Sequence, residues 1–346
     1  MKLLFPSLIF FISACHLTDK KNNPDVSHIK INLHIQRFEK DLFSLDTTNL
    51  SAGLSALHQK YPELCPLFFE SIMSFTDSFF VLDKQLQDKM KYFISDSIII
   101  NTYNKSQVQY QDFSSIESQI DHSLRFMKYY FPHKQEPNFY TVVSDFGVGN
   151  FIFEDAQQKD GIGIGLDFYL GSAIDYKMID PKNPSFSNYL NRCFNKDHLL
   201  KKSWEVWVND LIGPEPGEQL LDYIIHRGKK IWILTKILPT IPDTVLFEFT
   251  PDQLDWCQKN ETGIWSYFLS ENLLYSTEHK KFTKYINPSP NSPGMPDVAP
   301  GQTGSYIGYQ IIKAYFEKNP QTQIEDFVRE TNAQKILEMA RFKPKR

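Results

Sequence analysis

The chain has 346 residues, of which 41% are hydrophobic and 14% aromatic, and its formal net charge at pH 7 is −4. This composition excludes a disordered or fibrous chain and supports a large globular domain with an ample core. The small negative charge gives no electrostatic basis for binding nucleic acid, so we predict no nucleic-acid partner.

The first fifteen residues are typical of a lipoprotein signal peptide. Met1 and Lys2 give a positive start, an apolar run follows, and Ala14 stands directly before Cys15. The run of about ten residues is too short to span a bilayer, which needs roughly 20. We therefore predict cleavage before Cys15, lipidation of its thiol with fatty acyl chains such as palmitate, and anchoring to a membrane through the lipid.

Three segments follow from this pattern. Residues 1–14 are the predicted signal peptide, and residues 15–28 form a lipid anchor and a polar tether. Residues 29–346 are expected to form a single globular domain, with an N-terminal helical part over 29–135 and a sheet-and-helix part over 136–346.

The apolar pattern predicts the elements of this domain in chain order. Strands are expected over residues 29–38, 138–144, 149–153 and 161–170. Helices are expected over residues 50–61, 68–93, 115–130, 198–211, 218–238 and 305–317, and residues 251–274 are expected to be helical in pieces. Residues 322–339 complete the fold. The predicted class is α+β and mainly helical, with a small, mostly antiparallel sheet packed on helices.

Cys15 leaves three further cysteines, Cys65, Cys193 and Cys257. Their odd number prevents complete internal pairing, and their spacing fits neither a metal motif nor a redox pair. We expect buried, unreactive thiols, with one disulfide among them as the alternative.

Motifs of common secreted hydrolases are absent from the sequence. It contains no G-x-S-x-G and no H-E-x-x-H among its nine histidines. His198 and His226 lie on neighbouring predicted helices and could meet, but a capping or surface role is the simpler interpretation. No pattern selects an acid–base pair among the carboxylates of Asp145, Glu154, Asp155, Asp167 and Asp175. We therefore predict no catalytic residue, no metal site and no cofactor.

A Gly-x-Gly-x-Gly pattern occupies residues 161–165. A dinucleotide-binding loop would need a helix directly after it, and this stretch itself has the pattern of a strand. Alternate glycines clear one face of a strand, which leaves two interpretations: close packing against another element, or the approach of a bound peptide. On the second interpretation, Gly163, Gly165 and Tyr309 are candidate cleft residues.

Gly301, Gly304 and Gly308 surround the start of a late predicted helix. No Gly-Lys-Ser/Thr follows, so this is not a P-loop. Because Gly304 and Gly308 are four residues apart, they leave room for a neighbouring helix to pack closely.

Several stretches together carry a family resemblance. They are Ile35–Phe43, Gly161–Gly171, Gly228–Pro239, Pro300–Tyr309 and Ala333–Arg346. With the motif at Cys15, they resemble the gliding-motility lipoproteins of the GldB type, found in the Bacteroidota. The stretches follow in the right order and cover most of the mature chain.

The resemblance implies a fold similar to the zinc peptidases of the zincin type. There, one helix carries H-E-x-x-H and a later helix supplies a Glu followed by Gly. On this chain, residues 204–208 would take the first place and residues 227–228 the second. Trp204, Val208 and Arg227 would then replace the three metal ligands, and only Glu205, at the general-base position, would remain. The resemblance thus implies a degenerate peptidase.

The resemblance also implies a non-catalytic lipoprotein of the cell envelope that supports gliding motility and the associated protein secretion as a scaffold or regulator. Its partners would be the membrane, through the lipid on Cys15, and other gliding or secretion proteins. A periplasmic carrier of a lipid or peptide and a hydrolase with an unrecognised site are the alternatives. The tether lacks the acidic run of surface-exported lipoproteins, so we expect the domain to face the periplasm, with inner and outer membrane both open.

Overall fold

The computed structural model of the chain describes residues 23–345. The predicted signal peptide and Cys15 lie outside the described residues. The last residues of the predicted tether are described, and they lie against the domain: the side chain of Val26 is buried, and Arg125 donates a hydrogen bond to the carbonyl of Ser27 (3.1 Å). Among the described residues, no helix combines the length and the apolar character needed to cross a membrane.

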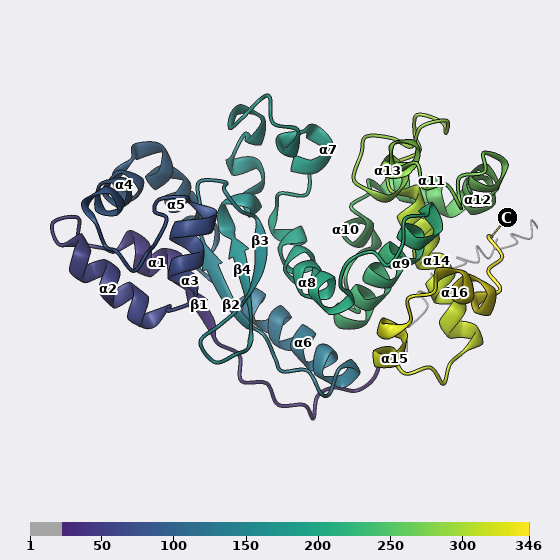
Figure 1. The fold of residues 1–346 in the computed structure, drawn as a ribbon, viewed down its shortest axis with the longest axis horizontal. Coiled ribbons are helices and arrows are strands. Elements are labelled where there is room, and N and C mark those ends of the chain that lie inside the picture. Colours follow the sequence, from purple (N-terminus) through teal and green to yellow (C-terminus); the bar gives the residue numbers. More distant parts are fainter. Residues whose placement is uncertain (1–22, 346) are drawn as a thin grey trace, which may run out of the picture.

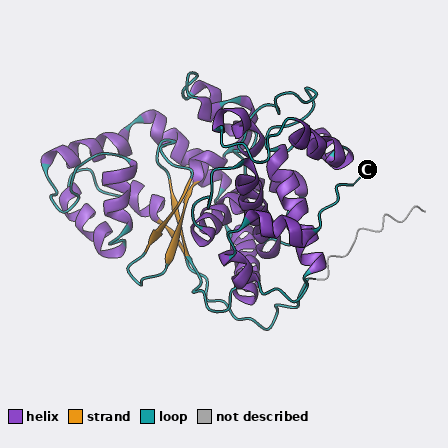
Figure 2. Cartoon of the chain, turned by 45° about the vertical axis from the view of Figure 1, so that its right-hand side comes forward, coloured by secondary structure: helices purple, strands orange, loops and turns teal. Residues whose placement is uncertain are grey.

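A four-stranded sheet lies in the middle of the molecule, between two groups of helices (Figures 1 and 2). Its strands are β1 (Ile35–Arg37), β2 (Asn138–Val142), β3 (Asn150–Glu154) and β4 (Asp160–Gly165), in the order β1-β2-β4-β3. β1 pairs with β2, and β2 with β4, in parallel, whereas β3 and β4 are antiparallel.

The prediction of a mostly antiparallel sheet is therefore wrong, and the sheet is mixed. The parallel pairs join strands that are separated by long connections, as parallel pairing requires. The prediction assumed that strands close in sequence would pair as hairpins, which holds only for β3 and β4. Two predicted strands were also too long: the first is regular only over Ile35–Arg37, and the last gives way after Gly165 to a 3₁₀ turn, η2 (Leu166–Tyr169).

The N-terminal helices cover one side of the sheet. They are α1 (Phe38–Phe43), α2 (Leu50–Lys60), α3 (Leu64–Pro66), the π-helical η1 (Leu67–Ile72), α4 (Lys84–Ser95) and α5 (Ser97–Gln109). The helix predicted over residues 68–93 is thus interrupted. Asp83 begins α4 by accepting a hydrogen bond from the backbone of Leu86 (2.8 Å), and Asp96 begins α5 in the same way (2.8 Å to Ile98).

The C-terminal part is almost entirely helical. Short turns η3 (Gly171–Ala173), η4 (Tyr176–Met178), η5 (Pro184–Phe186) and α7 (Asn188–Asn191) lead into it. The helices are α6 (Ser114–Tyr130), α8 (Lys196–Ile212), α9 (Leu220–Ile237), α10 (Asp243–Phe247), α11 (Pro251–Lys259), α12 (Glu261–Ser270), α13 (His279–Ile286), α14 (Thr303–Lys318), α15 (Ile324–Arg329) and α16 (Ala333–Ala340). The mainly helical α+β class is confirmed.

The sheet separates two hydrophobic cores. Side chains of successive β2 residues point to opposite faces, so Tyr140 and Val142 join the core of the N-terminal helices, whereas Phe139 and Val143 join the larger C-terminal core. Helix α6 packs in the larger core although it precedes the sheet in sequence. Helix α6 therefore belongs with the helices that follow the sheet in the chain.

The cysteines within the described residues are buried and unpaired, as expected. Burial raises the pKa of the Cys193 thiol to about 11 and that of Cys257 to about 12. It raises the pKa of Cys65 as well. These thiols stay protonated at neutral pH and are poor nucleophiles.

Helices α9 and α14 cross at a pair of glycines. A Cβ atom on Gly308 would lie 2.0 Å from the carbonyl oxygen of Ile224, and one on Gly228 would lie 2.3 Å from the carbonyl carbon of Gly308. Both obstacles are backbone atoms, which cannot move aside as a side chain can. The close approach expected at Gly308 is confirmed, and its partner is Gly228.

Replacing Gly308 by alanine should therefore destabilise the fold by at least about 2 kcal/mol, because the two helices must separate. Urea unfolding followed by circular dichroism measures the change. Gly263, on α12, is the matched control, since a Cβ there meets nothing within 4 Å. Gly263→Ala should stabilise the protein by up to about 1 kcal/mol through helix propensity. Equal effects of the two substitutions would contradict the crossing.

Candidate functional site: a pocket of paired lysines and glutamates

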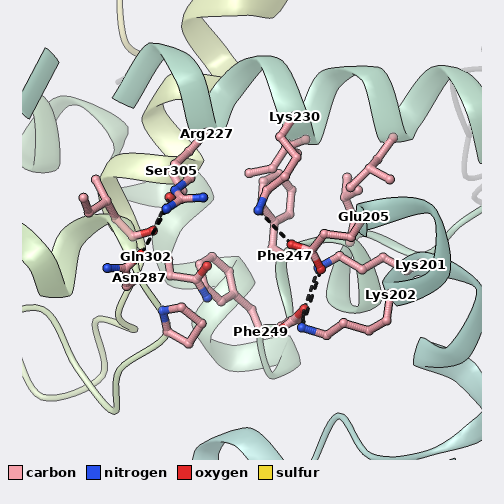
Figure 3. Close-up of a pocket in the computed structure, with 16 residues that line it drawn as sticks. Lys201, Lys202, Glu205, Arg227, Lys230, Phe247, Phe249, Asn287, Gln302 and Ser305 are labelled. Carbon is pink, nitrogen blue, oxygen red and sulfur yellow. Dashed lines mark hydrogen bonds and ion pairs between the residues drawn. The ribbon is translucent and has the colours of Figure 1, made fainter. Parts of the chain in front are cut away.

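A small cavity of about 70 Å³ lies where α8, α9, the end of α10 and the start of α14 meet. Its polar lining is shown in Figure 3 and consists of Lys201, Lys202, Glu205, Arg227, Lys230, Glu248, Asn287, Gln302 and Ser305. Phe247 and Phe249 supply part of its apolar wall. Charged side chains from distant parts of the chain thus converge on one enclosed site.

Helix α8 contributes one charged face. The helix begins at Asn195, whose side chain accepts a hydrogen bond from the backbone of Asp197 (3.0 Å). Lys201, Lys202 and Glu205 lie at positions i, i+1 and i+4, which bring side chains to one side of a helix. The opposite side of α8 is apolar and packs against β3 and β4. Burial of that apolar side turns the charged face toward α9.

Helix α9 contributes the facing cations. Its first turn is held by a capping box between Gln219 and Asp222, with a distance of 2.9 Å from the Gln219 backbone nitrogen to the Asp222 carboxylate. Arg227 and Lys230 lie three residues apart and so share a side of the helix. Both reach the pocket (Figure 3).

Three lysines share two carboxylates in the pocket. The ammonium of Lys201 lies 2.8 Å from Glu205 and 2.5 Å from Glu248. Lys202 lies 2.6 Å from Glu248, and Lys230 lies 2.8 Å from Glu205. The side chains of Lys201 and Glu248 are only 6% and 7% exposed, so these are largely buried ion pairs. We call these five residues the Lys–Glu cluster.

The electrostatics keep the cluster ionised. Burial by itself would raise the pKa of both carboxyls, but the neighbouring lysines outweigh it, holding the pKa of Glu205 well below its usual range and that of Glu248 at about 2. Burial would lower the pKa of Lys202, but the carboxylates of Glu248 and Glu205 raise it overall. For Lys230, burial wins and the pKa is lowered.

Arg227 continues the polar lining toward α14. Its guanidinium lies 2.8 Å from Glu215 and donates a hydrogen bond to Asn287 (3.4 Å). Its Nε is buried and has no hydrogen-bond partner within the described part of the chain. Beside it, α14 begins at Gln302, which has a left-handed backbone (φ 63°) and offers no side-chain cap.

The sequence-predicted site residues occupy two different environments. Glu205 and Arg227 both line the pocket. Trp204 and Val208 are fully buried in the hydrophobic core and do not line the pocket, and the indole of Trp204 donates a hydrogen bond to Ser123 (2.8 Å). The structure therefore brings together two of the four positions of the implied degenerate motif and separates the other two from them.

The glycines of β4 lie inside the structure. A Cβ on Gly163 would lie 2.1 Å from the ring of Phe151, and one on Gly165 would lie 2.2 Å from the carbonyl oxygen of Val148. The space beside them is thus filled by the protein's own groups, which agrees with close packing. Tyr309, on α14, packs against Phe247 (ring centroids 5.4 Å apart) and does not line the pocket.

The two histidines with a possible shared role are each bonded locally. His198 contacts the side chain of Asn195 (3.0 Å), and His226 contacts the carbonyl of Gly213 (3.0 Å). This arrangement agrees with the simpler of the two interpretations. Within residues 23–345, no group of three or more His, Cys, Asp or Glu side chains is arranged to hold a metal ion.

Among the candidate carboxylates, Asp167 is fully buried. It accepts hydrogen bonds from the backbone of Ser144 (3.0 Å) and of Phe146 (2.7 Å). Asp145 and Phe146 both have left-handed backbones (φ 53° and 62°). Burial raises the pKa of Asp167 to about 6. Its visible role is to hold this turn.

Sequence reasoning missed Lys201, Lys202, Lys230 and Glu248. The i, i+4 spacing of Lys201 and Glu205 is a detectable signal for an ion pair on a helix. Glu248 is 47 residues from Lys201, and no local pattern connects them.

The fold and pocket define a mainly helical α+β protein built on a mixed sheet, with a buried site made of paired lysines and glutamates. Over residues 19–344, the sequence matches the family described as gliding motility protein GldB. The chain belongs to this family of gliding-motility lipoproteins, which suggests a location in the cell envelope. Comparisons with curated proteins and with solved structures found no match.

The Lys–Glu cluster predicts a loss of stability in acid. The pKa of Glu248 is about 2 in the folded protein and about 4.5 without the fold, so between these values the unfolded chain binds more protons. The stabilisation is complete above about pH 4.5 and is lost as the pH falls toward 2. Urea midpoints measured across this range should fall steadily, and a flat profile would refute the prediction.

Glu248→Gln should destabilise the protein at pH 7 by about 3 kcal/mol, because Lys201 and Lys202 lose a shared, buried counter-charge. The variant should also flatten the acid profile. Glu278→Gln is the matched control: Glu278 is 65% exposed and pairs with Lys281 across the surface (2.5 Å). Its effect should stay below about 0.5 kcal/mol.

Proposed function

We propose that this chain is a non-catalytic lipoprotein of the cell envelope, held by lipid on Cys15 and facing the periplasm. It supports gliding motility and the associated protein secretion as a scaffold or regulator that binds other proteins of that machinery. The family match supports the process. The observation that carries the non-catalytic part is the Lys–Glu cluster, whose paired lysines and glutamates line the pocket in place of metal ligands.

We further propose that the fold is zincin-like and that the site is a degenerate metallopeptidase site. In H-E-x-x-H, the residues at i and i+4 bind zinc and the Glu at i+1 acts as base. On the pocket-facing side of α8, residues with this spacing are Lys201, Lys202 and Glu205. In this alignment Lys201 stands at the position of the first zinc ligand, and Lys202 stands at the position of the general base.

The alignment that places the general base at Glu205 does not give a working zinc site either. Its ligand positions, Trp204 and Val208, are buried in the hydrophobic core and do not line the pocket. Glu205 itself has a strongly lowered pKa because of the lysines around it, and a general base working near pH 7 needs a pKa close to that value. The ammonium groups of Lys201 and Lys230 would also repel a divalent cation.

Deletion of the gene should abolish surface spreading and the export of adhesins, and the wild-type gene should restore both. Cys15→Ala should yield a folded but unanchored protein that fails to restore them, because the domain is no longer held at the membrane. Colony spreading, secreted adhesin and membrane fractionation measure these outcomes. Lys259→Met, at a side chain that is 71% exposed, is the matched control and should restore both traits. Normal spreading of the deletion strain would refute the proposed process.

A second experiment separates a scaffold from a peptidase. Glu205→Gln should retain motility in proportion to the amount of folded protein, since no chemistry depends on this carboxylate. Motility lost at a wild-type level of equally stable protein, together with stoichiometric zinc in the wild type, would instead establish an enzyme.

A further inference from the structure

The pocket carries more positive charge than its own carboxylates neutralise. Lys201, Lys202 and Lys230 share Glu205 and Glu248, which leaves one ammonium charge without a counter-charge within the cluster. Figure 3 shows the side chains of Lys201, Glu205 and Lys230 turned toward one another.

The charged groups around the cluster do not remove this excess. Arg227 is matched by Glu215 (2.8 Å), so that pair is neutral. On another side, Arg192 donates to the backbone carbonyl of Glu248 (2.5 Å) and thus adds a cation. The local field therefore favours an anion.

The excess charge is poorly hydrated. The side chains of Lys201 and Lys230 are 6% and 12% exposed. A buried cation without a counter-ion is costly, and a bound anion would relieve that cost. The lowered pKa of Lys230, which burial causes, agrees with an ammonium that lacks full compensation.

Donors for such an anion line the same cavity. The Nε of Arg227 is buried without a hydrogen-bond partner among the described residues. Gln302 and Ser305 belong to the start of α14, a helix of 16 residues whose first turn has no side-chain cap. The free backbone N–H groups and the dipole of a helix start favour negative charge nearby. Arginine, lysine and helix start thus converge from three separate elements.

We propose that this pocket binds a single carboxylate group. The cavity of about 70 Å³ has room for a few water molecules or one small oxyanion. One uncompensated positive charge matches a monoanion better than a phosphate dianion. The carboxylate is that of a small free acid or the C-terminus of a polypeptide, and both present the same group to Arg227 and the lysines. The inference does not depend on the gliding role, because it concerns binding by the purified protein.

The test uses the full-length lipoprotein in detergent at pH 7 and constant ionic strength. Acetate should raise the Tm in a saturable way, since it binds the folded state alone. Arg227→Gln and Lys230→Met should weaken apparent acetate affinity at least tenfold, and Arg227→Lys, which keeps the charge but not the Nε donor, should have a smaller effect. Lys259→Met should leave acetate binding unchanged.

Two short peptides of the same sequence identify the source of the carboxylate. If the peptide with a free C-terminus binds more tightly than acetate and its amidated form does not bind, the ligand is a chain terminus. If acetate binds as well as the free-acid peptide, the ligand is a small acid.

Three results would overturn the proposal. They are the absence of a saturable Tm shift with both acetate and the free-acid peptide, binding that persists in Arg227→Gln and Lys230→Met, and tighter binding of inorganic phosphate than of acetate. If a charge-removing variant does not fold, Arg227→Lys is the test, since it keeps a cation beside Glu215 and removes the Nε donor. Acetate affinity equal to that of the wild type in Arg227→Lys would then overturn the proposal.

Discussion

The close crossing of α9 and α14 sets the geometry on which the pocket depends. At Gly228 and Gly308 the two backbones touch without side chains between them. Arg227 and Lys230 flank the first glycine, and Ser305 precedes the second by less than one helical turn. The contact therefore fixes the distance between the basic side of α9 and the start of α14. A larger residue in place of Gly228 or Gly308 would push α9 and α14 apart and so widen the pocket.

The ion pairs of the Lys–Glu cluster connect several helices at one point. Lys201 and Glu205 lie on α8, and Lys230 lies on α9. Glu248 is the residue that ends α10, and its backbone is left-handed. Salt bridges of this kind hold only while every member is charged, because a single unpaired charge in the interior is costly. Such a centre holds α8, α9 and the end of α10 in fixed positions relative to one another.

The sheet determines how the rest of the chain is arranged. It separates a core formed by the N-terminal helices from a larger core that includes α6, α8, α9 and α14 (Figures 1 and 2). The pocket lies wholly on the second side. The predicted anchor at Cys15 precedes a segment that contacts this same side, where Arg125 of α6 binds the carbonyl of Ser27. The N-terminal helices lie on the other side of the sheet, around their own core.

The sequence by itself determined the features that depend on neighbours along the chain. Helices α2, α6, α8, α9 and α14 were predictable because apolar spacing and capping residues act within a few positions, and the signal and family motifs are linear by nature. Strand pairing was not predictable, because β1 and β2 are parallel neighbours although the whole N-terminal helical segment and α6 lie between them in the chain.

The pocket was decided by tertiary structure alone. Glu205 and Arg227 were identifiable as positions of interest, but which way α8 turns depends on the burial of Trp204 against the sheet and α6. That rotation selects Lys201, Lys202 and Glu205 as the side facing α9, where they meet Glu248 from the end of α10. Charged residues that are dozens of positions apart become partners only when the fold buries them side by side. The pattern of residues along the chain does not predict such pairs.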